Sequence, residues 1–239
     1  MGFLLQTISV CATLAALCML ASSVITVKSM RAVKSVGSMT ITFFCAQLLN
    51  CNVWGLYGVQ TLALPVIICN TFGSAIAAYC ILMFLAVARM EEKAGHVLKS
   101  TSYVASLTTA TLTMFLIALL LLLFLYLMSF SSSDFAAQLI GILGGCCSVF
   151  MLSSPLGMAK TIIRERNAES LQPATVMFAT LNSVLWTLYG LLSLDMYITI
   201  PNVLCTLACI FQVFLLVRYG RHPAEHVEIT ATIAPVPLD

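Results

Sequence analysis

Charged residues are scarce in this sequence. Only 8% of its 239 residues are Asp, Glu, Lys or Arg, whereas 61% are hydrophobic, and the mean hydropathy is +1.04. A soluble globular domain carries about 25% charged residues. The composition therefore excludes an ordinary soluble domain and indicates a protein whose surface faces lipid.

Ionisable groups are also absent from the interiors of the long apolar runs. A helix needs roughly 20 apolar residues to cross a bilayer, and the sequence has seven such runs, at about 3–27, 39–60, 62–88, 104–129, 135–159, 172–192 and 195–217. The first run is long for a signal peptide and lacks a basic n-region, so it predicts a true span. Asp134 and Asp195 lie only at the ends of runs.

This absence narrows the classes of function. Ionisable side chains inside a membrane mark proton relays, ion coupling and counter-charges for charged substrates. Acid–base or metal catalysis within the membrane needs the same groups. We therefore expect a transporter and not an enzyme, with a neutral substrate that moves down its own gradient and no cofactor.

The sequence predicts no metal site. All ten cysteines fall within the predicted spans, where cysteine behaves as a small hydrophobic residue. Cys205 and Cys209 share a helix face, but no His or carboxylate lies near them to complete a metal site. His222 and His226 are also four residues apart, but they belong to a polar tail with Pro223 between them, which favours a solvated segment.

The basic residues predict the orientation. They follow the first, third, fifth and seventh runs: Lys28, Arg31 and Lys34; Arg89, Lys93 and Lys99; Lys160, Arg164 and Arg166; Arg218 and Arg221. Seven spans place these four clusters on one side of the membrane, and basic loops are typically cytoplasmic. We expect the N-terminus outside, the C-terminus in the cytoplasm and the protein in the plasma membrane.

An internal repeat organises the chain. The segments NCNVWGLYGVQTLALPVIICN and NSVLWTLYGLLSLDMYITIPN share five residues at a constant offset of 132: Asn50/Asn182, Trp54/Trp186, Tyr57/Tyr189, Gly58/Gly190 and Asn70/Asn202. SSVITVK at 22–28 and SSPLGMAK at 153–160 also correspond. A repeat of this kind must be explained by the fold.

Three spans end on the side opposite to where they began, so one additional span is needed to make two copies parallel. We therefore predict an all-α membrane protein with a 3+1+3 arrangement. Residues 1–101 form the first three-helix bundle, 102–130 a linker helix, 131–217 the second bundle and 218–239 a disordered cytoplasmic tail.

The repeated polar residues predict a substrate site. Trp54, Trp186, Asn70 and Asn202 lie about seven to nine residues from the predicted outer turns, which is about 10–14 Å along a helix. A carboxamide supplies donors and an acceptor without net charge, and an aromatic face supplies apolar contact. These groups suit a sugar. Asparagine also links transmembrane helices and tryptophan also anchors interfaces, but the shared depth and repetition favour a site.

The other candidate residues, four from the repeat and two prolines, each have two possible roles. Asn50 and Asn182, one turn deeper, are candidate pore-lining residues or helix–helix contacts. Tyr57 and Tyr189 lie near the outer turns, where they are interface anchors or parts of an outer gate. Pro155 in the fifth span and Pro173 near the start of the sixth are static kinks or hinges, since proline removes a helical hydrogen bond.

These motifs resemble the SWEET sugar transporter family, also called MtN3/saliva. The resemblance rests on the LLNC–W–LYG run with Asn70, on SPL in the fifth span, and on LQP…W–LYGLLSLD…IPN with Asn202, and it covers about residues 5–220. It implies parallel repeats and facilitative sugar transport in either direction. Asn70, Asn202 and Trp186 match sugar-binding positions, and Trp54 occupies a variable position, where it would narrow the pocket.

The resemblance also implies a gate and a difference between the bundles. Tyr57, Tyr189 and Asp195 match outer gating positions, but residues 63–66 read ALPV, so the lysine that pairs with this aspartate in some members is absent. Family members carry prolines in spans one, two, five and six. Ser23 and Phe43, or a residue near it, replace the first two here, so we expect the second bundle to move more.

Two other functions remain open. Related seven-helix proteins are proton-coupled amino acid carriers, which should show an intramembrane carboxylate, or non-transporting receptors, which should show basic residues along the pathway. The sequence shows neither. The expected partners are a neutral sugar and membrane lipid, with no nucleic acid, and the resemblance implies a homo-oligomer.

Overall fold

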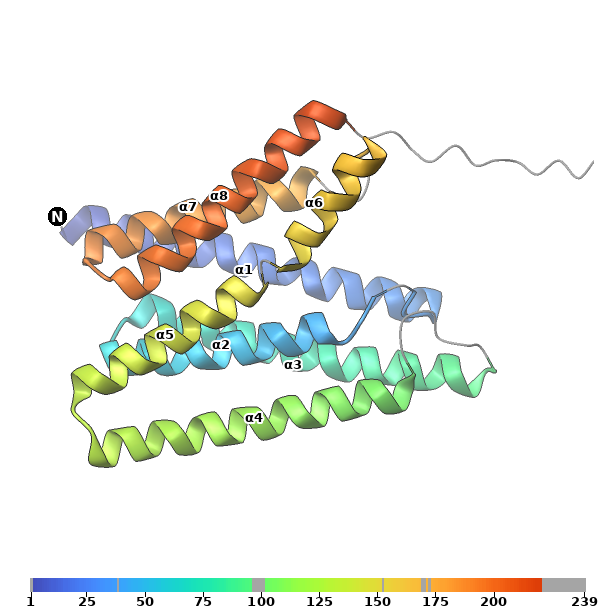
Figure 1. Cartoon of the computed structure of the whole chain (residues 1–239). Helices are drawn as coiled ribbons and strands as arrows, with labels where there is room; N and C mark the ends of the chain where they lie inside the picture. The colour runs from blue at the N-terminus through green and yellow to red at the C-terminus, as the bar shows by residue number, and fades with distance from the viewer. Residues whose placement is uncertain are drawn as a thin grey trace, which may run out of the picture.

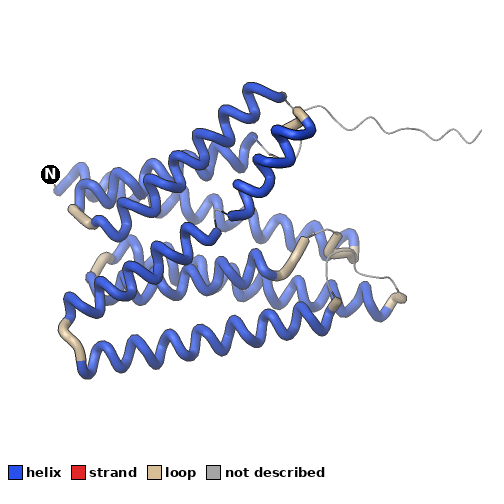
Figure 2. Tube along the Cα trace, in the orientation of Figure 1, coloured by secondary structure: helices blue, strands red, loops and turns tan. Residues whose placement is uncertain are grey.

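The computed structural model describes residues 2–37, 39–95, 102–151, 153–168, 171 and 173–220, with side chains left out over 153–158. Within these ranges all regular structure is helical (Figures 1 and 2). The helices are α1 (Gly2–Val33), α2 (Thr42–Thr61), α3 (Leu64–Lys93), α4 (Tyr103–Phe130), α5 (Ser133–Met151), α6 (Ser153–Glu165), α7 (Pro173–Ser193) and α8 (Met196–Tyr219). The predicted all-α class is confirmed.

The helices account for the predicted spans. Six of them, α1, α3, α4, α5, α7 and α8, are long and apolar enough to cross a membrane. Helix α6 continues the fifth predicted span beyond α5. Helix α2 has 20 residues and is more polar, because it carries Gln47, Asn50, Asn52 and Gln60. The chain is an integral membrane protein.

The helix contacts repeat between the two halves. In the first half α1 and α2 both pack against α3, and in the second α5, α6 and α7 pack against α8. Helix α4 packs against α2, α3 and α5 (Figure 1). Two contacts join the halves, α1 with α7 and α2 with α5. They are equivalent, because α1 corresponds to α5 and α2 corresponds to α7 in the repeat. We call residues of α1–α3 the first bundle and residues of α5–α8 the second.

The backbone reproduces the repeat in detail. Leu62 after α2 and Leu194 after α7 have φ of 54° and 57°. Lys34 and Arg166, at the other end of the molecule, have φ of 57° and 52°. A positive φ is uncommon for residues other than glycine, yet both pairs recur at the offset of 132. The repeat in the sequence is therefore a repeat of conformation.

The first spans of the two copies differ. Helix α1 runs unbroken over 32 residues and buries Ser23, whereas its counterpart in the second copy is described as two helices, α5 up to Met151 and α6 from Ser153. Pro155, the counterpart of Ser23, has no N–H to bond the carbonyl of Met151 four residues earlier. Figure 1 shows that α6 leaves the direction of α5. One proline therefore explains where the second copy bends.

The other two prolines of interest have different positions in their helices. Pro173 is the first residue of α7, where proline costs no hydrogen bond because the first turn has no acceptor for its N–H. Pro201, by contrast, lies inside α8, directly before Asn202. Whether Pro173 is a hinge or a static kink stays a prediction, and Pro201 is a further proline within a span.

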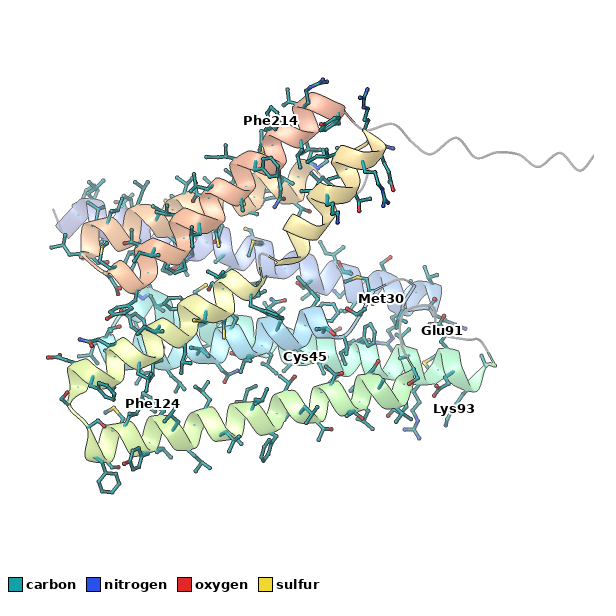
Figure 3. The ribbon with its side chains drawn as sticks, in the orientation of Figure 1. Met30, Cys45, Glu91, Lys93, Phe124 and Phe214 are labelled. Carbon is teal, nitrogen blue, oxygen red and sulfur yellow. The ribbon has the colours of Figure 1, made fainter. Side chains whose placement is uncertain are left out.

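The hydrophobic cores divide the molecule along its length. We call the end with the α2–α3 and α7–α8 turns the turn end, and the opposite end, with the basic residues, the basic end. At the turn end, described residues of both bundles and of α4 form one joint core: Ala12, Ala16, Val53, Trp54, Tyr57, Val66, Cys69, Leu127, Ala136, Ile140, Trp186, Tyr189 and Ile198. Phe124 of α4 packs against it (Figure 3).

At the basic end the described residues form two separate cores. One belongs to α1–α4 and includes Met30 and Cys45, which Figure 3 labels. The other belongs to the second bundle and includes Ile162 and Leu215. The bundles are thus packed together at the turn end and packed independently at the basic end.

Candidate functional site

The two tryptophans occupy equivalent places in the joint core. The ring centroids of Trp54 and Tyr57 lie 5.4 Å apart at 86°, and those of Trp186 and Tyr189 lie 5.4 Å apart at 78°. Edge-to-face pairs of this kind hold both rings in defined orientations. The structure therefore brings all four predicted aromatic residues together at the contact between the bundles.

Asn70 and Asn202 are half-buried and also equivalent. Asn70 Nδ2 donates to the Val66 carbonyl at 2.8 Å, and Asn202 Nδ2 donates to the Ile198 carbonyl at 2.8 Å. No described residue donates to either Oδ1, and neither oxygen is among the buried atoms without a partner. Each amide thus presents a fixed, accessible acceptor, which suits a hydroxyl that donates to it.

The deeper asparagines differ from each other. On α2 the indole Nε1 of Trp54 donates to Ser148 Oγ at 3.0 Å, and Ser148 Oγ donates to Asn50 Oδ1 at 3.2 Å. On α7 Asn182 Oδ1 is buried and has no hydrogen-bond partner in the described part of the chain. Asn50 is therefore satisfied by the protein, whereas Asn182 retains an unpaired acceptor.

A hydrogen bond closes the turn end between the bundles. The Tyr57 hydroxyl lies 2.9 and 2.8 Å from the two carboxylate oxygens of Asp195. Asp195 Oδ1 also accepts from the backbone N–H groups of Tyr197 and Ile198, so it caps α8. A recess of about 480 Å³ lies beside this pair at the turn end, lined by Tyr57 and residues 193–197.

Asp195 has a tyrosine partner and no lysine partner. Among the described residues the single ion pair is Arg164–Glu165, which is exposed at the basic end. This agrees with the ALPV sequence at 63–66. The three residues predicted for the outer gate therefore have different contacts. Tyr57 and Asp195 form a direct hydrogen bond, and Tyr57 and Tyr189 both belong to the joint core.

Two polar contacts between the bundles were not predicted from the sequence. One is the hydroxyl of Ser148, and the other is Gln60, whose Nε2 donates to Ser133 Oγ at 2.7 Å and to the Ser133 carbonyl at 3.1 Å. The repeat could not reveal them, because the counterparts of Ser148 and Gln60 are Ala16 and Leu192. No sequence signal marks either contact.

We expect Asp195→Ala to lower thermal stability more than Tyr57→Phe. Both variants lose the bond between the bundles, but only Asp195→Ala also loses the cap of α8, which is worth about 1 kcal/mol. The melting temperature of detergent-purified protein, followed by size-exclusion chromatography, measures the difference. Equal melting temperatures, or a lower one for Tyr57→Phe, would contradict this double role of Asp195.

Metal binding has no support in the described residues. Within them no three His, Cys, Asp or Glu side chains cluster in a way that would hold a metal ion. His222 and His226 lie outside the described ranges.

Comparisons with known proteins agree with this geometry. The family model for sugar efflux transporters for intercellular exchange (MtN3/saliva) matches residues 6–92 and 138–224, two segments offset by the same 132 residues. The chain is 27% identical over 206 residues to the bidirectional sugar transporter SWEET7b of Oryza sativa subsp. indica, covering 82% of this chain and 71% of that protein.

Two further relatives come from other organisms. The chain is 28% identical over 231 residues to the bidirectional sugar transporter SWEET7 of Arabidopsis thaliana, covering 93% of this chain and 82% of that one. It is 24% identical over 216 residues to the sugar transporter SWEET1 of Dictyostelium discoideum, covering 90% and 94%.

The fold also has a solved counterpart. A structure of a eukaryotic SWEET transporter superposes with a TM-score of 0.78 at 22% identity, covering 90% of this chain and 96% of that one. The shared fold, the duplicated Asn–Trp–Tyr–Gly–Asn motif and the match of the family model to both repeats lead to one conclusion. The chain belongs to the SWEET (MtN3/saliva) family of sugar transporters.

Proposed function

We propose that the protein is a facilitative, bidirectional sugar transporter, a uniporter that moves mono- or disaccharides by alternating access. The observation that carries this proposal is the pair of equivalent asparagines, Asn70 and Asn202, each with its Nδ2 bonded to its own helix and its Oδ1 left for a ligand. Family membership supports the sugar as substrate.

The proposed site divides the work between amides and indoles. Asn70 and Asn202 accept hydrogen bonds from sugar hydroxyls, and Trp54 and Trp186 flank the apolar face of the ring. Asn182 Oδ1, which is buried and unpaired, is a further acceptor for a substrate hydroxyl. A buried polar atom without a hydrogen-bond partner destabilises the protein. A substrate hydroxyl that donates to this oxygen removes that destabilisation and so favours binding.

The proposed cycle starts from the described conformation. Tyr57 and Asp195 close the turn end, and the bundles have separate cores at the basic end. The basic residues favour a cytoplasmic basic end and an N-terminus outside. The described conformation is then closed to the outside. The location that we propose is the plasma membrane. The homo-oligomer stays a prediction from the family resemblance.

The alternative functions lack supporting observations. A proton-coupled amino acid carrier needs a carboxylate that titrates inside the membrane, but Asp195 caps α8 at the turn end. A receptor of this fold needs basic residues along the pathway, and the basic residues described on α1, α3, α6 and α8 lie in the last two turns of these helices or just beyond them. A panel of sugars and amino acids tested for uptake at two pH values separates these functions.

We expect sugar uptake to persist when a protonophore collapses the pH gradient, because no Asp, Glu, Lys, Arg or His lies in the interior of a predicted span, where it would couple proton movement to transport. Radiolabelled glucose uptake in transporter-deficient cells, measured with and without the protonophore, gives the answer. A neutral solute carried by an unrelated facilitator serves as control for metabolic side effects. A larger loss of rate for this protein than for the control would contradict the uniporter mechanism.

A further inference from the structure

The side-chain hydrogen bonds between the bundles all start on one face of α2. In the described part of the chain Trp54 donates to Ser148, Ser148 donates to Asn50, Tyr57 donates to Asp195 and Gln60 donates to Ser133. Residues 50, 54, 57 and 60 follow the three- and four-residue spacing of one helix face. We call these contacts the polar seam.

The equivalent contact between α1 and α7 has no such seam. Asn182, Trp186, Tyr189 and Leu192 stand where α2 has its four residues, and no hydrogen bond to the first bundle is found for any of them among the described residues. Ala16 stands where α5 has Ser148, and it is 5% exposed within the joint core. The two contacts between the bundles are thus polar on one side and apolar on the other.

At the level of the proposed sugar site, the α2–α5 contact is polar because of Ser148. Its hydroxyl accepts from the indole of Trp54 and donates to the amide of Asn50, so a residue of the second bundle fixes two residues of the first. Gly144 lies one turn away on α5, and a Cβ there would stand 3.0 Å from the Trp54 ring. The indole is therefore held between a close backbone and a hydrogen bond.

We propose that Ser148 is a positioning residue that latches α2 to the second bundle, whereas the α1–α7 contact has no latch and serves as the sliding side. The proposal rests on the alternating access of the proposed function. When the turn end opens, α2 must leave its partners and the hydrogen bonds of the seam must break. Apolar contacts on the α1–α7 side lack directional bonds and permit displacement without such a loss.

The repeat supplies the matched pair of variants that tests the latch. Ser148→Ala removes it and leaves the Trp54 N–H and Asn50 Oδ1 unpaired. Ala16→Ser places a hydroxyl at the position equivalent to Ser148, from which the repeat leads us to expect that it reaches the unpaired Asn182 Oδ1 and builds a second latch. Ser148→Thr keeps the hydroxyl and serves as the conservative control.

The readout is the distance between labels at Leu62 and Leu194, which are equivalent, 85% and 83% exposed, and lie at the two turns. Non-cysteine labelling is required because the chain has ten cysteines. Pulsed electron paramagnetic resonance in nanodiscs, with and without glucose, gives the ratio of turn-end-open to turn-end-closed molecules. One hydrogen bond changes such a ratio about fivefold.

We expect Ser148→Ala to raise the open-to-closed ratio by more than about fivefold, because it removes two hydrogen bonds. Ser148→Thr should leave the ratio near that of the unaltered protein, and Ala16→Ser should lower it severalfold. An unchanged ratio in Ser148→Ala, or a raised ratio in Ala16→Ser, would overturn the latch. If Ser148→Ala does not fold, Ala16→Ser decides alone: a lowered ratio supports the latch, and an unchanged or raised ratio refutes it.

The same experiment separates the latch from the proposed function. If the unaltered protein shows one distance in all conditions and takes up no sugar, alternating sugar transport fails and the latch fails with it. If the unaltered protein shows two distances and transports sugar, but Ser148→Ala leaves the ratio unchanged, the latch alone fails.

Discussion

Asn202→Ala is expected to reduce sugar uptake at least about 100-fold while the protein stays in the membrane. The variant loses the acceptor that Asn202 Oδ1 offers, and the sugar hydroxyl that would donate to it is buried without a partner. Sites that hydrogen-bond a substrate lose large factors when one partner is missing. Asn70→Ala should behave alike, because Asn70 has the same bond geometry.

Asn52→Ala is the matched control for this loss. Asn52 is also a half-buried amide in a span, and its Nδ2 donates to the Leu48 carbonyl at 2.8 Å and lies 3.4 Å from Ser74 Oγ within the first bundle. Radiolabelled glucose uptake, normalised to surface expression, should fall far less in this variant. Uptake at the unaltered rate in both Asn202→Ala and Asn70→Ala would refute the site.

Gly190→Ala is expected to cause a large loss of folded protein. A Cβ at Gly190 would stand 2.6 Å from Thr199 Oγ1, 2.9 Å from its backbone nitrogen and 3.1 Å from its Cα. Thr199 Oγ1 donates to the Asp195 carbonyl, so its side chain is held in place, and α7 must move away from α8. Overpacking of this kind costs about 1–3 kcal/mol.

Gly145→Ala is the control, since a Cβ at Gly145 has no neighbour within 4 Å. Gly58→Ala should give a smaller effect than Gly190→Ala, because the nearest atoms, from Ile67, stand at 3.0 Å. Monodisperse yield and melting temperature in detergent rank the three variants. A Gly190→Ala protein as stable as Gly145→Ala would contradict the close packing of α7 on α8.

The repeat made much of the fold predictable. Its offset of 132 residues, the basic clusters and the apolar runs predicted the helices and their 3+1+3 order, because a bilayer demands long apolar helices and parallel copies need a linker. The equivalent conformations at Leu62 and Leu194 follow from the same repetition. The prediction was strongest where both copies carry the same residue.

The prediction failed where the copies differ. Ser148 and Gln60 bond across the bundles, but their counterparts are Ala16 and Leu192, so no pattern marks them. Such contacts depend on which helix faces meet, and pairs of residues 73 to 98 positions apart carry no local signal of that. The role of a proline is also hard to predict from sequence, because its effect depends on whether it begins a helix or interrupts it. Whether Pro173 is a hinge or a static kink stays a prediction.

The most direct test is a structure of the protein in a lipid nanodisc with a bound sugar. We predict a sugar between the indoles of Trp54 and Trp186, with its hydroxyls within hydrogen-bond distance of Asn70 Oδ1 and Asn202 Oδ1. A sugar bound elsewhere, or asparagine oxygens that face the acyl chains, would contradict the account.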